Sequence, residues 1–263
     1  MSFRKSFLPL PTRMKFEIIH IDETDSTNRW LREMKQGDGS FVTSADVTKE
    51  PSPCFIVVAE YQTAGKGCGS NSWESERGKN LTFSMLIHPE RIAANEQFRI
   101  TEVVSVALCE TLEAIVDQDV RIKWPNDIYV GDRKICGMLI ENRLQGTVIK
   151  DSIIGIGLNV NQRQFLSDAP NPVSLYQLTG QETDREALLK DFLEAFERVT
   201  ERQSCAADYR ARLYRKGEKA LYEDQSGRFV ARLTDVLPDG RLVLQDEEGQ
   251  ERTYAFKEVG FIV

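Results

Sequence analysis

Short apolar runs separated by polar or glycine-rich segments dominate the first two thirds of the chain, and they predict strands. Such runs occur at 16–21, 54–59, 81–88 and 149–160. Their length, and the turn residues at their ends, are typical of strands buried in a sheet. Their distribution along the chain predicts a mixed sheet.

Residues 121–142 predict further strands. Pro125 interrupts the first apolar stretch, and because proline cannot donate a ladder hydrogen bond, this stretch reads as two short strands. The segment Lys134–Asn142 alternates between apolar and polar positions. We expect Lys134 and Cys136 to share one face of this strand. A lysine at such a position either prevents an exposed edge strand from pairing with other chains or belongs to a functional site.

Apolar residues recur with the helical period in three places. Trp30, Leu31 and Met34 predict a helix that follows the polar segment 24–28. Residues 96–117 predict a helix with one apolar face. The pair Thr183 and Glu186 has the spacing of a capping box and predicts a long helix after it, with a second helical stretch continuing to Arg215.

After residue 216 the pattern changes to short strands. We expect them near 228–237, 241–246 and 251–256, separated by turn residues. This spacing is that of a small all-β barrel. The predicted fold is therefore α+β, with one domain over residues 1–216, built on a mixed β-sheet flanked by helices, and a small barrel domain over residues 217–263.

Composition narrows the classes of function. The chain has 263 residues, of which 41% are hydrophobic and 29% charged, enough for one large core and one small one. Its net charge is −7 and it has no dense basic run, which disfavours nonspecific nucleic-acid binding. Residues 1–13 lack the apolar core of a signal peptide, and no apolar run reaches membrane-spanning length. We therefore expect a cytoplasmic protein.

The cysteines and histidines argue against two kinds of site. Five cysteines form no CxxC pair, and only two histidines are present, so neither a zinc site nor a hydrolase triad is expected. An odd number of cysteines within apolar patterns suggests reduced thiols.

A glycine-rich loop follows the strand that ends near Ala59. Glycines at 65, 67 and 69 permit positive φ and close approach of backbone N–H groups, and Lys66 adds a charge. Such a row of amides suits an anion. The spacing matches neither common nucleotide-binding fingerprint, so the loop taken alone is either an anion site or a flexible surface turn.

Several polar segments at strand ends and helix starts carry a resemblance to a known family. They are Asp25-Ser26-Thr27-Asn28, Ala59 to Gly67 with Trp73, Lys123-Trp124-Pro125-Asn126-Asp127, Arg133-Lys134 with Gly137, and Gly155-Ile156-Gly157-Leu158-Asn159. In order and spacing, the chain resembles biotin protein ligases from about residue 16 to its C-terminus. It is similar to the monofunctional type, without the DNA-binding domain of members that repress transcription.

The resemblance implies that residues 1–216 form the catalytic domain, that the C-terminal barrel is SH3-like, and that the chemistry has two steps. Biotin and ATP give biotinyl-5′-adenylate, and a lysine of a biotin carboxyl carrier protein then takes the biotinyl group. Biotin and ATP would be substrates, Mg²⁺ would accompany ATP, and no metal site would be built from the protein alone. No nucleic acid or membrane partner is implied. Because the nucleophile of the first step is the carboxylate of biotin, no catalytic serine or cysteine is needed.

The resemblance also assigns roles to residues. The implied catalytic residues are Lys134, Lys66 and Asp127, of which Asp127 would orient the incoming lysine. Biotin-binding residues would be Ser26, Thr27, Asn28, Gln62, Lys66, Gly67, Cys68, Lys134 and Gly137. ATP-binding residues would be Gly65, Trp73, Asn126, Lys134 and Asn159. Without the resemblance, Ser26, Thr27 and Asn28 are explained as helix caps.

The chain departs from the family pattern in the glycine loop. Lys66 stands where many members have arginine, which keeps the charge but loses the bidentate geometry. Cys68-Gly69-Ser70-Asn71 occupies a segment that many members fill with arginines. Cys68 is either a neutral loop thiol without a role, or the cause of weaker retention of the adenylate.

Two alternative functions remain open. A lipoate or octanoate ligase or transferase shares the fold, and the pair Lys134 and Cys136 invites comparison with octanoyltransferases. A non-catalytic protein that binds biotin or an adenylate is the other alternative, because the loop is poor in arginine.

Overall fold

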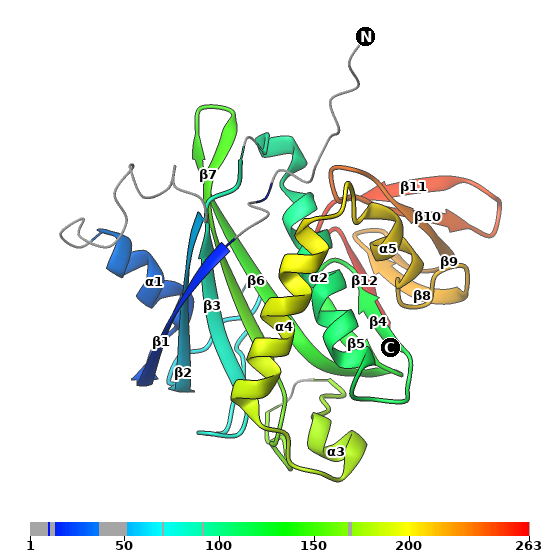
Figure 1. Ribbon diagram of the computed structural model, residues 1–263. Coiled ribbons are helices and arrows are strands. Elements are labelled where there is room, and N and C mark those ends of the chain that lie inside the picture. Colours follow the sequence, from blue (N-terminus) through cyan, green and yellow to red (C-terminus); the bar gives the residue numbers. More distant parts are fainter. Residues whose placement is uncertain are drawn as a thin grey trace.

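The structure of the protein is a computed structural model that describes residue 10 and residues 14–36, 52–69, 71–90, 92–167 and 170–262 (Figure 1). Residues 1–9 and 11–13, which bear on the expectation about a signal peptide, lie outside this range, as does Ser70 of the glycine loop. Two β-sheets organise the described chain, one with seven strands and one with five. The predicted α+β class, a mixed sheet with helices followed by a small all-β unit, is confirmed.

The first sheet has the strand order β1-β2-β3-β7-β6-β5-β4. Its strands are β1 (Met14–Thr24), β2 (Ser52–Gln62), β3 (Leu81–Ile87), β4 (Val120–Lys123), β5 (Asp127–Val130), β6 (Arg133–Gln145) and β7 (Val148–Leu158). Strand β1 runs parallel to β2, and the other neighbours are antiparallel, so the sheet is mixed as predicted. The predicted break at Pro125 separates β4 from β5.

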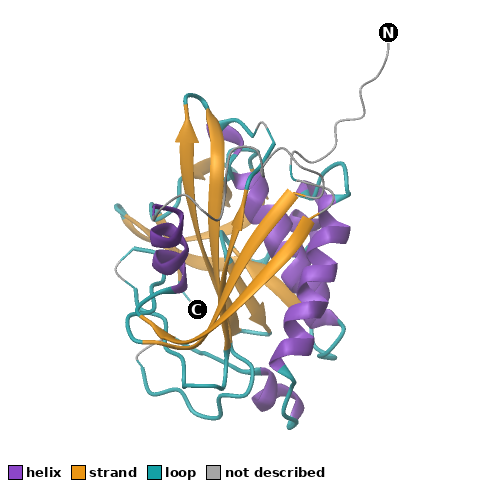
Figure 2. Cartoon of the chain, turned by 60° about the vertical axis from the view of Figure 1, so that its left-hand side comes forward, coloured by secondary structure: helices purple, strands orange, loops and turns teal. Residues whose placement is uncertain are grey.

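Helices cover the two faces of this sheet unequally. They are α1 (Thr27–Gln36), the 3₁₀ turn η1 (Ala94–Glu96), α2 (Phe98–Glu113), α3 (Leu175–Thr179), α4 (Arg185–Thr200) and α5 (Ala206–Ala211). Helices α2 and α4 lie together over one face, and α1 lies on the other (Figure 2). Along β3, Phe83 and Met85 pack into the α2–α4 core, whereas Leu86 packs with Leu31 of α1. Because α1 covers only part of its face, the rest of that face is left for a site.

Two helix starts differ from the prediction. The cap of α4 is Asp184, whose Oδ1 accepts hydrogen bonds from the N–H groups of Glu186 and Ala187, so the predicted capping box at Thr183 is wrong. The complete capping box belongs to Ser174 and Gln177 at the start of α3, a helix that the sequence analysis did not predict. A helix of five residues is too short to show a period.

The second sheet is antiparallel, with the order β11-β10-β9-β8-β12. Its strands are β8 (Lys219–Asp224), β9 (Gly227–Val236), β10 (Leu242–Asp246), β11 (Glu251–Tyr254) and β12 (Val259–Phe261). Strands β9, β10 and β11 are the three predicted ones, whereas β8 and β12 were missed. The sheet begins just after residue 216, and the division into two domains there stays a prediction.

The segment between β4 and β5 is attached to the second sheet and to α5. Trp124 Nε1 donates to Gly240 O over 2.8 Å, and the Trp124 ring contacts that of Phe256 edge to face. Tyr209 Oη donates to Pro125 O over 2.8 Å. These contacts place the second sheet against one end of the first.

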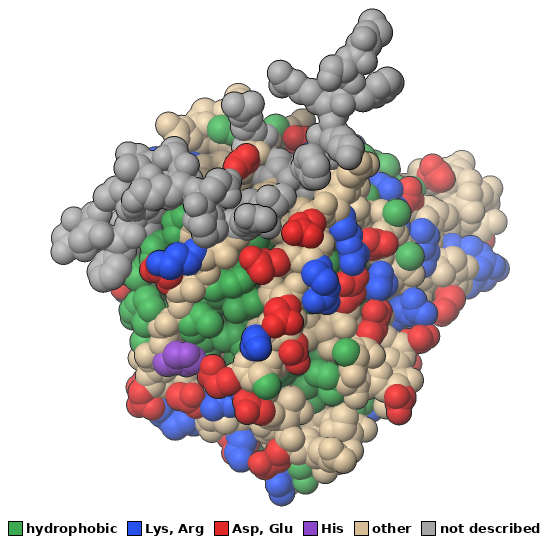
Figure 3. Space-filling model, viewed as in Figure 1, with side chains coloured by type: hydrophobic (Ala, Val, Ile, Leu, Met, Phe, Trp, Pro, Cys, Tyr) green, Lys and Arg blue, Asp and Glu red, His purple; other side chains and the backbone are tan. Residues whose placement is uncertain are grey.

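The surface over α4 carries both signs of charge. Figure 3 shows acidic and basic side chains interspersed there, and ion pairs such as Lys190 with Glu194 are among them. Beside them, apolar side chains gather over the β1 side of the sheet, where Ile18 is 41% exposed. Among the described helices, none is both long enough and apolar enough to cross a membrane.

Candidate active site

A cavity of about 420 Å³ opens on the face of the first sheet that α1 leaves uncovered. This volume suits a small organic ligand. Its walls come from the start of α1, the glycine loop, the segment 123–127, strands β6 and β7, and the turn between β11 and β12. Residues from all five recognised motifs, which are distant in sequence, therefore meet at one place.

The floor of the cavity is a glycine pair on neighbouring strands. Gly137 of β6 is directly opposite Gly157 of β7, so the sheet has no side chains there. The indole of Trp73 occupies the space, since a Cβ at Gly157 would lie 2.3 Å from its Cε2 and a Cβ at Gly137 would lie 3.1 Å from its Cζ3. The glycines thus allow Trp73 to lie flat against the backbone, where its Nε1 is buried without a hydrogen-bond partner in the described chain.

One end of the cavity is built on the N-terminus of α1. The backbone N–H and the hydroxyl of Thr27 donate to Gln62 Oε1 over 2.8 and 3.0 Å. The hydroxyl of Ser84, on β3, lies 2.7 Å from Thr27 Oγ1 and 2.6 Å from Asn28 Oδ1. Ser26, Thr27 and Asn28 are all buried and line the cavity. Helix capping does not require such a network, and Ser84 is a member that the sequence reading missed.

Asn28 is held on both ends of its amide. Its Nδ2 donates to Glu141 Oε2 over 2.8 Å and to Leu139 O over 3.2 Å. A Cβ at Gly155 would lie 2.3 Å from Asn28 Oδ1, so this position on β7 requires glycine for the close approach. The amide is therefore fixed in orientation at the cavity wall.

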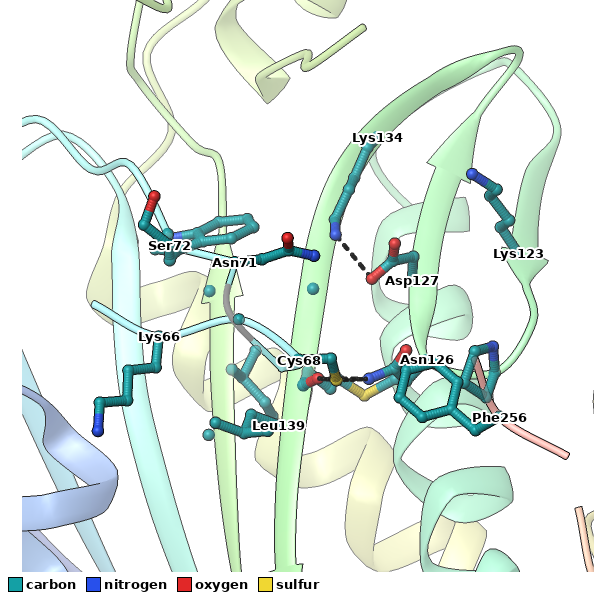
Figure 4. Close-up of a pocket in the computed structure, with 18 of the residues that line it drawn as sticks. Lys66, Cys68, Asn71, Ser72, Lys123, Asn126, Asp127, Lys134, Leu139 and Phe256 are labelled. Atoms are coloured by element: carbon teal, nitrogen blue, oxygen red, sulfur yellow. Dashed lines mark hydrogen bonds and ion pairs between the residues drawn. The ribbon is translucent and has the colours of Figure 1, made fainter. Parts of the chain in front are cut away.

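The glycine loop returns on itself as a short hairpin. Lys66 and Ser72 form a β-bridge, Gly67 N donates to Asn71 O over 2.8 Å, and Trp73 N donates to Gly65 O over 2.9 Å. The Lys66 side chain is exposed, and Figure 4 shows it directed away from Lys134, although both residues line the cavity.

The other end of the cavity is charged. Lys134 Nζ is 2.7 Å from Asp127 Oδ1 and 5.8 Å from the centre of the Trp73 ring (Figure 4). Lys123 Nζ donates to Tyr129 Oη over 3.1 Å. Burial, with the neighbouring Lys134 cation, lowers the pKa of Lys123 against the opposing effect of Asp127.

The balance of charge in the cavity is strongly positive. Its described lining contains four lysines, at 66, 123, 134 and 257, and one carboxylate, Asp127. The whole chain carries a net charge of −7. A cluster of cations on an acidic protein, beside backbone amides, is suited to an anionic ligand.

Cys68 lies inside this cationic part and is in contact with Asn126. Asn126 Nδ2 donates to Met138 O over 2.6 Å and lies 3.1 Å from Cys68 Sγ (Figure 4). The thiol fills a position next to the cavity without adding charge.

The structure contradicts the expectation that Lys134 and Cys136 share a face. A β-bulge places Tyr129 opposite Lys134 and Ile128 opposite Cys136, so Ile135 is the additional residue on β6. As a result Lys134 reaches the cavity, whereas Cys136 is fully buried in the core. Burial raises the pKa of the Cys136 thiol, which keeps it protonated.

Two of the predicted site residues stand behind the cavity wall. Gly65 supports the hairpin but does not line the cavity. Asn159 donates from Nδ2 to Val173 O over 3.0 Å and is 2% exposed. The other predicted residues do line the cavity: Ser26, Thr27, Asn28, Gln62, Lys66, Gly67, Cys68, Trp73, Asn126, Asp127, Lys134 and Gly137.

The lining also includes residues that the sequence reading did not single out. Lys123 could have been found, since it belongs to a recognised motif. Phe256, Lys257 and Phe261 come from the second sheet, and no pattern in that part of the chain marks them. Only the packing of the two sheets brings them to the cavity.

Comparison with known proteins agrees with this geometry. Residues 24–159 match the model of the Biotin/lipoate A/B protein ligase family. The bifunctional ligase/repressor BirA of Bacillus spizizenii is 29% identical over 218 residues, covering 76% of this chain. The chain thus spans 64% of the length of that relative. The biotin–[acetyl-CoA-carboxylase] ligase of Mycobacterium tuberculosis is 27% identical over 198 residues, which are 72% of each chain.

A solved structure extends the similarity to the second sheet. The biotin protein ligase of Aquifex aeolicus, in complex with biotin and ATP, superposes with a TM-score of 0.73 and 25% sequence identity. The match covers 93% of this chain and 97% of that one. The chain therefore belongs to the biotin/lipoate A/B protein ligase family, and its similarities lie with the biotin protein ligases of that family.

Proposed function

We propose that the protein joins biotin to a lysine of a biotin carboxyl carrier protein, through biotinyl-5′-adenylate formed from biotin and ATP. The observation that carries this proposal is the division of one cavity into two chemically different ends. A neutral hydrogen-bonding network lies at the α1 end, whereas Lys123, Lys134 and the single carboxylate Asp127 lie at the other, and Lys66 and Lys257 also line the cavity. Biotin has a neutral ureido ring, and its carboxylate and the phosphates of ATP are anionic.

The ureido ring offers two N–H donors and one carbonyl acceptor. At the α1 end, Thr27, Asn28 and Gln62 present hydroxyl and amide groups that can both donate and accept. These side chains are already oriented by hydrogen bonds to one another and to Ser84. We infer that they bind the ureido ring with little further ordering.

In the first step, a carboxylate oxygen of biotin attacks the α-phosphorus of ATP, and the bond from that phosphorus to the pyrophosphate oxygen breaks. Two anions must approach each other, so the contribution expected of the protein is positioning and neutralisation of charge. Lys134 is suited to neutralise the developing charge, and Lys66 and the amides of the glycine loop to hold the carboxylate and phosphate. Trp73 and Asn126 would lie on the nucleotide side.

In the second step, the amine of the carrier lysine attacks the biotinyl carbonyl, and AMP leaves. The amine must be unprotonated to react. Asp127 is the one carboxylate in the described lining, and we infer that it orients this amine.

Mg²⁺ is proposed to enter with the phosphates of ATP. Among the described residues no group of three or more His, Cys, Asp or Glu side chains could hold a metal ion by itself. The site that the residues offer is one for an anion, and Mg²⁺ would reduce the charge of the triphosphate bound there.

Lipoate or octanoate in place of biotin is the second candidate, since the family includes lipoate ligases. Those acyl chains have no ureido group, so they could not use the remaining donors and acceptors of the polar network at the α1 end, which disfavours them. The full burial of Cys136 also removes the Lys134 and Cys136 pair as a nucleophilic device.

Exchange of labelled pyrophosphate into ATP tests the proposal. We expect exchange that depends on biotin and is absent with lipoate or octanoate. Exchange with one of those acids instead would assign a different substrate, and binding of biotin without any exchange would make the protein a non-catalytic binder. Transfer to a biotin carboxyl carrier protein then tests the second step.

A further inference from the structure

The glycine loop places the neutral residue Cys68 at the cavity, and a lysine from the second sheet lies beside this loop. A Cβ added to Gly69 would lie 2.6 Å from Lys257 Nζ and 3.2 Å from its Cε. Gly69 directly follows Cys68, and Cys68 and Lys257 line the same cavity. Residues far apart in the sequence thus meet, and Lys257 places an ammonium group beside a loop position that lacks one.

The backbone of Lys257 is in the left-handed region, with a φ of 72°. This conformation is uncommon for a residue with a side chain. The turn is held by its neighbours, because Ala255 N donates to Glu258 Oε2 over 2.7 Å and Glu258 N donates to Ala255 O over 3.1 Å. Residues held in such a conformation occur preferentially at functional sites.

Lys257 has no carboxylate partner in the described chain. The nearest acidic residue in sequence, Glu258, is engaged with the backbone of the turn. The ammonium group lies over the ring of Phe256, 5.9 Å from its centre. Phe256 in turn packs against Trp124, next to the charged end of the cavity. The ammonium group is therefore free to pair with an anion in the cavity.

We propose that Lys257 binds the phosphate of ATP and of the adenylate, and so supplies from the second sheet the charge that Cys68 does not provide. This inference rests on the proposed function and adds a binding residue to it. It also gives the second sheet a part in the site, since Lys257 is contributed by the turn between β11 and β12.

The test uses Lys257→Asn in the full chain, because asparagine tolerates the left-handed conformation and the variant should fold. Lys219→Asn is the matched control, since Lys219 lies in the same sheet and pairs with Glu247 outside the cavity. We expect Lys257→Asn to raise the KM for ATP and the rate of adenylate release about tenfold, the effect of losing one exposed charge-assisted hydrogen bond. Binding of biotin without ATP, measured by calorimetry, should not change.

A second variant tests whether the lost charge, and not a change in structure, causes the effects of Lys257→Asn. Cys68→Arg should restore the KM for ATP and slow adenylate release in the Lys257→Asn background, and have a smaller effect in the wild type. Wild-type values in Lys257→Asn, or an equal effect of Cys68→Arg in both backgrounds, would overturn the inference. Absence of biotin-dependent exchange in the wild type would instead refute the proposed function, and calorimetry with ATP would still report on Lys257.

Discussion

Lys134 and Asp127 form an ion pair across the neighbouring strands β5 and β6, with 2.7 Å between Nζ and Oδ1. Both side chains are about one quarter exposed, at 29% and 27%, and both line the cavity. The pair is therefore accessible to a ligand and not sealed in the core. Its two members are proposed to act in different steps, so substitutions can separate them.

Lys134→Ala should reduce the rate of adenylation by about 10²–10³, which corresponds to about 2–4 kcal/mol of lost transition-state stabilisation. The cation is removed from the reacting phosphate, and Asp127 is left without its partner. Biotin-dependent pyrophosphate exchange measures the effect. Lys190→Ala on α4, whose lysine is exposed and pairs with Glu194, is the control and should exchange normally. Near-normal exchange in Lys134→Ala would remove this lysine from the proposed role.

Asp127→Asn should impair the second step more than the first. The amide keeps the size of the side chain but cannot attract the amine of the carrier lysine, so we expect transfer from preformed adenylate to fall at least about tenfold. Adenylation should be affected less, because Lys134 remains. Single-turnover transfer and pyrophosphate exchange, measured on the same variant, give the two rates. Equal losses in both would contradict the assignment of Asp127 to transfer.

Gly155→Ala and Gly157→Ala should damage opposite ends of the cavity. An added methyl would lie 2.3 Å from Asn28 Oδ1 in the first variant and 2.3 Å from Trp73 Cε2 in the second, so each neighbour must move. We expect the KM for biotin to rise chiefly in Gly155→Ala and the KM for ATP chiefly in Gly157→Ala. Each variant is the control for the other, and the same pattern in both would argue against two distinct subsites.

Glu102→Gln should change how stability depends on pH. Burial raises the pKa of the Glu102 carboxyl to about 7, against the opposing effects of Arg210 and Arg99. The pKa of this carboxyl in the folded state lies above its ordinary value of 4.5. Its contribution to the free energy of unfolding is therefore full below about pH 4.5 and is lost as the pH rises through 7.

The difference in free energy of unfolding, variant minus wild type, should therefore be larger at pH 8 than at pH 4.5, by about 2–3 kcal/mol. Urea denaturation at the two pH values measures the difference. A difference that is the same at both pH values would show that the carboxyl does not titrate in this range.

The long elements and the recognised motifs were readable in the sequence because their signals are local. The helical period over α2 and the apolar runs of β2 and β3 mark segments that the structure buries. The segment 123–127 could be singled out in the sequence by its proline and its polar residues. Even for these, the helix caps depended on single side chains, and Asp184 took the place expected for Thr183.

Which side chains meet was decided by pairing and packing between distant segments. The bulge at Ile135 directs Lys134 into the cavity and Cys136 into the core, where strict alternation predicted one face for both. Because Gly137 and Gly157 are paired on neighbouring strands, the sheet leaves room for the ring of Trp73. The packing of the second sheet brings Lys257 next to Gly69. Periodicity is a property of neighbouring residues, whereas register and the approach of one sheet to another depend on the free energy of the whole fold, which no single stretch of sequence contains.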